Sequence, residues 1–123
     1  MVVEDDAFIA LDIEQALRAA GYADVRAFGR KASALSFLEG ETPALALLDL
    51  NLGRGETSID IAVSLKKRGC PFVFLTGYTE ATVPLPPDLS EAPRLSKPFD
   101  VAELTGAVEG LAGSGTRPLS ASA

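Results

Sequence analysis

The sequence predicts an α/β domain built as a doubly wound parallel sheet of five strands. Short apolar runs alternate with helical patterns of about a dozen residues, which is typical of repeated βαβ units. Residues 44–48 are apolar without alternation, as expected for a central parallel strand covered on both faces. A chain of 123 residues with 47% hydrophobic content is long enough to bury the core of one such domain.

Four helices are expected, and three of them are marked by an apolar stripe that precedes a glycine. The stripes lie at residues 9–20, 35–38 and 61–65, before Gly21, Gly40 and Gly69 respectively. The last helix has a stronger start signal, because Asp100 can cap it and Glu103 completes a capping box. Phe99 can also pack on Leu104 as a hydrophobic staple. Four residues of this helix are expected to face the core: Val101, Leu104, Val108 and Leu111.

The expected strands lie between these helices, at residues 2–3, 25–28, 44–48, 72–75 and 94–96. A further crossover helix would be expected before the last strand, but four of the eight prolines fall between Pro84 and Pro93. Proline disfavours helix at its own position and at the residue before it. This helix should therefore be short or degenerate, with residues 83–93 irregular or forming a single turn. Residues 1–111 are expected to form the domain, and residues 112–123 a disordered tail.

Composition excludes several classes of function. The net charge of -6 argues against sequence-independent binding of nucleic acid or anionic membranes. The absence of histidine removes imidazole bases and imidazole metal ligands, and the single Cys70 is expected to be a small buried residue. Without a signal-like N-terminus or an apolar run long enough to cross a membrane, the protein is expected in the cytoplasm.

The polar residues at the ends of the expected strands carry the candidate chemistry. They are Glu4 and Asp5 after the first strand, Asp49 after the third, Thr76 after the fourth and Lys97 after the fifth. Ligands bind outside the carboxyl ends of the strands in such sheets. Carboxylates at this edge suit Mg²⁺, and a carboxylate can accept a phosphoryl group when metal and cation neutralise the charge. The Thr76 hydroxyl and the Gly77 amide can bind phosphoryl oxygens.

Each of these residues has an ordinary structural explanation when it is considered alone. Acids at a helix N-terminus stabilise the helix dipole, and Asp6 is a natural N-cap. Asp49 can start a turn, Thr76 can be a turn hydroxyl, and a lysine before proline is usually solvated. Their common position at one sheet edge favours a phosphoryl site.

Four motifs of the chain resemble those of two-component response-regulator receiver domains. They are residues 2–6 (VVEDD), 47–52 (LLDLNL), Thr76 and 96–99 (SKPF). The segment 71–78 (PFVFLTGY) is similar to the signature of the FAT GUY receivers, with Leu75 for alanine and a single glycine. The resemblance spans residues 1–111 and implies a flavodoxin-like sheet of strand order 2-1-3-4-5. It also implies a stand-alone signalling protein without an output domain.

The resemblance implies a role for each matching residue. Asp49 would be the phosphoacceptor, and Mg²⁺ would be bound by Asp5, Asp49 and the Asn51 carbonyl, with Glu4 acting through water. Thr76 and Lys97 would contact the phosphoryl group, and the bond from Lys97 to Pro98 would be cis. The donor would be a phosphohistidine of a sensor histidine kinase. The domain would catalyse no reaction other than its own phosphorylation and dephosphorylation. It would signal to an unidentified protein or phosphotransferase, or serve as a phosphate sink.

Two departures from the family pattern concern the signalling surface. Arg94 occupies the position of the usual aromatic switch residue, and we expect Tyr78 to take over its role, although Tyr78 can also be an aromatic that covers the sheet edge. The proline-rich segment replaces a helix that normally belongs to the output face.

Two alternative functions stay open from the sequence. One is a pseudo-receiver that binds partners without phosphorylation. The other is a haloacid-dehalogenase-like phosphatase with an aspartyl nucleophile, although Asn51 stands where such enzymes carry a second aspartate.

Overall fold

A five-stranded parallel sheet forms the centre of the molecule, in a computed structural model that describes residues 1–77 and 85–114. Its strands are β1 (Val2–Val3), β2 (Ala27–Phe28), β3 (Ala46–Asp49), β6 (Phe72–Thr76) and β7 (Arg94–Ser96). Their spatial order is β2-β1-β3-β6-β7, and every neighbouring pair is parallel. This order confirms the expected doubly wound, flavodoxin-like sheet.

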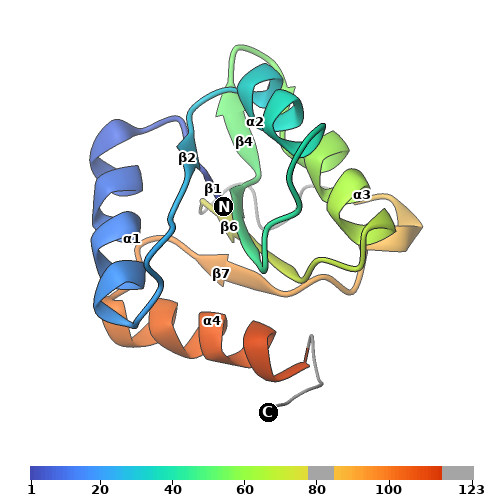
Figure 1. Ribbon diagram of the computed structural model, residues 1–123. Coiled ribbons are helices and arrows are strands. Elements are labelled where there is room, and N and C mark those ends of the chain that lie inside the picture. Colours follow the sequence, from blue (N-terminus) through green and yellow to red (C-terminus); the bar gives the residue numbers. More distant parts are fainter. Residues whose placement is uncertain (78–84, 115–123) are drawn as a thin grey trace.

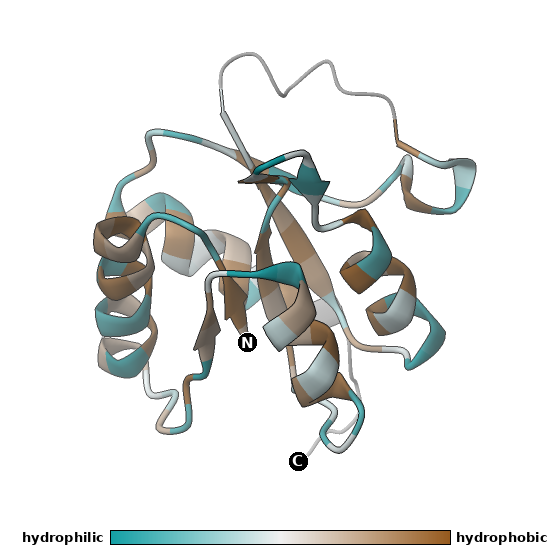
Figure 2. Cartoon of the chain, turned by 90° about the horizontal axis from the view of Figure 1, so that it is seen from above, coloured by the Kyte–Doolittle hydropathy of each residue, from teal (hydrophilic) through white to brown (hydrophobic). Residues whose placement is uncertain are grey.

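Helices cover both faces of the sheet (Figure 1). They are α1 (Ala7–Ala19), α2 (Lys31–Leu38), α3 (Ile59–Lys67) and α4 (Val101–Ser114). Successive strand residues point to opposite faces. Thus Val2, Leu47 and Val73 pack with α1 and α4, whereas Val3, Leu48 and Phe74 pack with α2 and α3. Figure 2 shows the central strands coloured as hydrophobic between the two helical layers.

Local signals at the helix ends act as the sequence predicts. The Asp6 carboxylate accepts hydrogen bonds from the amides of Phe8 and Ile9 at 2.9 and 3.2 Å, which caps α1. The capping box of α4 is formed in both directions: Asp100 accepts from the Glu103 amide at 2.7 Å, and Glu103 accepts from the Asp100 amide at 3.2 Å. These caps fix the two helices that flank the carboxyl edge of the sheet.

Two expectations about α4 need correction. Val101 was expected to face the core, but it is 65% exposed, while Leu104, Val108 and Leu111 are buried. Val101 is the first residue of the helix, so no preceding helical turn lies beneath its side chain. In addition, α4 continues to Ser114 and so includes residues 112–114, which were expected in the tail. The rest of the expected tail lies outside the described residues.

A short hairpin after the central strand was not predicted. It pairs β4 (Asn51–Gly53) with β5 (Glu56–Thr57) in antiparallel fashion. Leu50 and Leu52 are buried and attach this segment to the core. The observed strands also differ from the expected bounds, because β2 begins at Ala27 rather than Val25 and β3 spans Ala46–Asp49 rather than residues 44–48.

The proline-rich segment contains a single turn of 3₁₀ helix, η2 (Pro87–Leu89), within its described part. This confirms the prediction of a degenerate helix for residues 85–93, and buried Leu89 anchors the turn in the core. Cys70 is buried, as expected, and its thiol donates to the Pro43 carbonyl at 3.1 Å. None of the described helices combines the length and apolar content that crossing a membrane requires.

Candidate functional site

The carboxyl ends of four parallel strands bring the predicted polar residues to one edge of the sheet. Asp49 and Thr76 are the last residues of β3 and β6, while Glu4 and Lys97 directly follow β1 and β7. Asp49 is in register with Leu75, and the Lys97 amide donates to the Thr76 carbonyl at 2.8 Å. The site is therefore assembled by the sheet, at the place where ligands bind in this class of fold.

Three carboxylates form an acidic cluster at this edge. Oxygen atoms of Glu4, Asp5 and Asp49 all lie within 4.8 Å of one another. Glu4 and Asp49 are buried, each with 3% of its surface exposed, whereas Asp5 is exposed. Like charges held this close repel one another unless a cation is present. Hard carboxylate oxygens are the ligands that Mg²⁺ prefers, so the donor set fits this ion.

Lys97 supplies a positive charge inside the cluster. Its Nζ lies 2.9 Å from Glu4 Oε2 and 3.3 Å from Asp49 Oδ2. The other Glu4 oxygen accepts a hydrogen bond from the Asp6 amide at 3.2 Å. Both Glu4 carboxylate oxygens are thus engaged by neighbouring groups, whereas Asp5 is the exposed acid of the three.

The surroundings shift the pKa values of Asp49 and Lys97. Burial raises the pKa of Asp49 to about 8, with a further rise from the Glu4 charge and a partial reduction from Lys97. Burial by itself lowers the pKa of the Lys97 ammonium, but its interactions with Glu4 and Asp49 outweigh this and raise that pKa. Asp49 is therefore a carboxyl group whose ionised form needs additional positive charge to be favoured.

Two buried oxygen atoms at the site have neither a hydrogen-bond partner nor an ion-pair partner within the described part of the chain. They are Asp49 Oδ1 and Thr76 Oγ1. Buried polar atoms are normally paired, so unpaired ones at a candidate site indicate that a ligand or ion satisfies them. Both belong to residues that the sequence identified.

The remaining predicted residues are placed as follows. The Lys97–Pro98 peptide bond is cis, as predicted. Asn51 follows Asp49 at the start of β4, and its side-chain oxygen accepts a hydrogen bond from the Gly53 amide at 2.9 Å. Gly77 follows Thr76 and lies at the wall of a neighbouring pocket. Tyr78 lies outside the described residues, and Arg94 is exposed on β7.

One residue of the site was missed at the level of sequence. Gly53 has a φ of +78°, and a Cβ atom built on it would lie 3.3 Å from Asp5 Oδ2. The Gly53-Arg54-Gly55 segment is a turn signal that could have indicated the hairpin. Its proximity to Asp5 depends on the tertiary structure.

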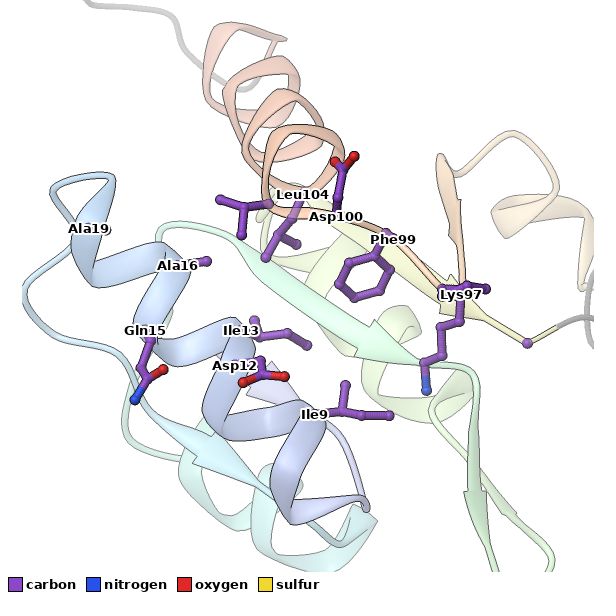
Figure 3. A pocket seen from close by; sticks show the side chains of 13 residues that line it. Ile9, Asp12, Ile13, Gln15, Ala16, Ala19, Lys97, Phe99, Asp100 and Leu104 are labelled. Carbon is purple, nitrogen blue, oxygen red and sulfur yellow. The ribbon is translucent and has the colours of Figure 1, made fainter.

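A pocket of about 890 Å³ adjoins the acidic cluster between α1 and the start of α4 (Figure 3). The side chains of Ile13 and Phe99 point into the space between the two helices, and Lys97 lies at the end of the pocket nearest Ile9. The lysine therefore borders both the pocket and the carboxylates.

Comparison with known proteins identifies the family. The family model described as "Response regulator receiver domain" matches residues 1–109. The chain belongs to the response-regulator receiver family. Receiver domains are signalling proteins of two-component systems rather than conventional enzymes, they are phosphorylated by histidine kinases, and they bind Mg²⁺ at an acidic pocket.

Individual relatives agree with this assignment. The transcriptional regulatory protein PdtaR of Mycobacterium tuberculosis is 32% identical over 111 residues, covering 89% of this chain and 54% of the relative. The chain thus spans about half the length of this curated relative. The solution structure of SdrG from Sphingomonas melonis Fr1 is 34% identical, with a TM-score of 0.77, and covers 89% of this chain and 92% of SdrG. A receiver protein from Sinorhizobium medicae is 25% identical, with a TM-score of 0.78 and 94% coverage of both chains.

Proposed function

We propose that this receiver domain acts in the cytoplasm, where it accepts a phosphoryl group on Asp49 from the phosphohistidine of a sensor histidine kinase. Phosphorylation then changes the affinity of the domain for a protein partner. The observation that carries this proposal is the environment of Asp49: one buried oxygen is 3.3 Å from Lys97, and the other has no hydrogen-bond partner among the described residues.

The proposed reaction moves the phosphoryl group from nitrogen to oxygen. A carboxylate oxygen of Asp49 attacks phosphorus, and the bond between phosphorus and the imidazole nitrogen breaks. The electron pair of that bond stays on the imidazole of the kinase, so no oxidant or further reactant is needed. The reaction requires Asp49 in its ionised form, which its raised pKa disfavours unless positive charge is added.

Mg²⁺ is the source of that charge in this proposal. Asp5, Asp49 and the Asn51 carbonyl would hold the ion, and Glu4 would act through a water molecule. When bound, the ion supplies neutralisation of the negative charge that gathers on carboxylate and phosphoryl oxygens. The close approach of three carboxylates and the unpaired Asp49 oxygen support this assignment.

Lys97 and Thr76 would bind the transferred group. Lys97 is already oriented toward Asp49, so it can donate to a phosphoryl oxygen after exchanging one of its carboxylate partners. The Thr76 hydroxyl, which has no partner among the described residues, and the Gly77 amide can supply further donors. A change in the position of Thr76 would alter the segment that follows it, beginning with Tyr78.

The downstream step has two forms: the domain transfers the phosphoryl group onward as a relay or sink, or it presents a changed surface to a target protein. Neither requires nucleic acid or a membrane as the direct partner. The presence of Asp49, Thr76 and Lys97 argues against a pseudo-receiver. Asn51 argues against an aspartyl phosphatase, because an amide cannot act as the second acid.

Two measurements test the proposal. Incubation with Mg²⁺ and acetyl phosphate should add the mass of one phosphoryl group to the wild-type protein and none to Asp49→Asn. Amide NMR spectra with Mg²⁺ and beryllofluoride should change around Asp5, Asp49, Thr76 and Lys97. Asp12→Asn, which removes an exposed acid of α1, is the matched control and should react like the wild type. Modification of Asp49→Asn, or no response in the folded wild type, contradicts the proposal.

A further inference from the structure

We propose that Gly53 is a positioning residue of the metal site, and that its lack of a side chain keeps the Asp5 carboxylate where it can bind Mg²⁺. This inference rests on the Mg²⁺ site of the proposed function. It extends that site to a residue that neither binds the ion nor contacts the phosphoryl group.

The geometry leaves little room for a side chain at Gly53. A Cβ atom built there would lie 3.3 Å from Asp5 Oδ2. Real Cβ atoms seldom approach another heavy atom this closely, so either Asp5 or the backbone of the hairpin would have to shift by a few tenths of an ångström.

The backbone on the Gly53 side is fixed. The Gly53 amide donates to Asn51 Oδ1 at 2.9 Å, and Gly53 is paired with Glu56 across the hairpin. The preceding Leu52 is 4% exposed and anchors the strand in the core. A side chain at Gly53 would therefore displace Asp5 more readily than the hairpin.

The backbone around Asp5 is also held. Glu4 is buried and paired with Lys97, and Asp6 caps α1. The exposed Asp5 side chain is thus the part that can move, and its shift would change the position of its carboxylate relative to Glu4 and Asp49. Mg²⁺ demands a nearly ideal octahedron of ligands, so displacing one carboxylate weakens binding.

The same hairpin contains a matched control. Gly55 has a φ of +77°, close to the +78° of Gly53, but a Cβ built on Gly55 meets nothing within 4 Å. Substitution of either glycine strains the backbone to a similar extent. Only the Gly53 substitution also crowds Asp5.

The test compares Mg²⁺ affinity by isothermal titration calorimetry in the wild type, Gly53→Ala and Gly55→Ala. Thermal melts in Mg²⁺-free buffer measure the strain, and both variants should lose similar stability. We expect Gly53→Ala to bind Mg²⁺ about three- to tenfold more weakly, which is at or below the lower limit of the roughly 10- to 100-fold effects of residues that hydrogen-bond to metal ligands. Gly55→Ala should bind like the wild type. Equal affinities in the two variants would overturn the role of Gly53.

Three further variants keep the test decisive. Asparagine tolerates positive φ better than alanine, so the pair Gly53→Asn and Gly55→Asn repeats the comparison if the alanine variants do not fold. Asp5→Ala examines the metal site itself and should reduce affinity at least about tenfold. Wild-type affinity in Asp5→Ala would refute the Mg²⁺ site of the proposed function. Loss in Asp5→Ala with equal affinities in the glycine pair would refute the role of Gly53 alone.

Discussion

Lys97 is closer to Glu4 than to Asp49, with 2.9 Å between Nζ and Oε2 compared with 3.3 Å to the Asp49 oxygen. The lysine expected to contact the phosphoryl group is thus engaged mainly by a neighbouring acid before phosphorylation. Glu4 has two functions in this arrangement, because it contributes to the acidic cluster and also orients the lysine.

Removal of the ammonium by Lys97→Met should lower the free energy of unfolding by about 2–4 kcal/mol at neutral pH, because the buried Glu4 carboxylate loses its cation. A loss at the upper end of this range would apply to a fully buried ion pair. Because the Lys97 side chain is 22% exposed, the expected loss of stability is below that limit. Urea denaturation in Mg²⁺-free buffer measures the loss. The double variant Glu4→Gln, Lys97→Met should recover part of it, and wild-type stability in Lys97→Met would show that the pair contributes little.

Asp49→Asn should stabilise the Mg²⁺-free protein increasingly as the pH rises. The pKa of Asp49 is about 8 in the folded state, against 3.8 ordinarily. Between these values the folded wild type retains a proton that the unfolded chain has released, so its stability falls as the pH rises. Asparagine does not titrate, and the advantage of the variant should reach at least about 1 kcal/mol near pH 8, the equivalent of a one-unit shift.

Chemical denaturation of wild type and Asp49→Asn between pH 5 and 9 checks this expectation. Asp12→Asn, which removes an exposed carboxylate on α1, controls for the loss of one negative charge. An identical pH dependence in both variants would mean that Asp49 titrates like a surface acid.

Thr76→Val should reduce the response of the domain to phosphorylation without reducing its stability. The Thr76 hydroxyl is buried and makes no hydrogen bond in the described part of the chain, so its replacement by a methyl group should leave stability within about 0.5 kcal/mol or increase it. The response of the amide NMR spectrum to beryllofluoride should nevertheless be reduced. Thr76→Ser, which keeps the hydroxyl, should retain the response. A full response in Thr76→Val would remove the hydroxyl from the switch.

The two apolar residues at the start of α4 should respond differently to truncation. Leu104 is 3% exposed, and Leu104→Ala should cost about 2–4 kcal/mol through lost burial and the cavity left behind. Val101 is 65% exposed, and Val101→Ala should change stability by no more than about 0.5 kcal/mol. Thermal or urea denaturation of the two variants measures both values. A large loss for Val101→Ala would mean that this side chain is covered in solution.

Much of the fold was predictable because its signals are local. The caps at Asp6 and Asp100 depend on atoms within three residues of each other, so their hydrogen bonds follow directly from the sequence. The position of Asp49 at a strand end was predictable as well, because the apolar run before it stops there. Val101 was wrongly predicted because periodicity gives the face of a helix without showing where the packed partner ends.

The sequence by itself determined which residues end the strands, and therefore which chemical groups gather at one edge of the sheet. Only the tertiary structure decided how those groups share their charges: Lys97 pairs first with Glu4, and burial raises the pKa of Asp49. It also brought Gly53 against Asp5, across many intervening residues of chain. The physical reason is that strand ends are specified by local pattern, whereas ion-pair distances and burial arise from segments that meet only after folding.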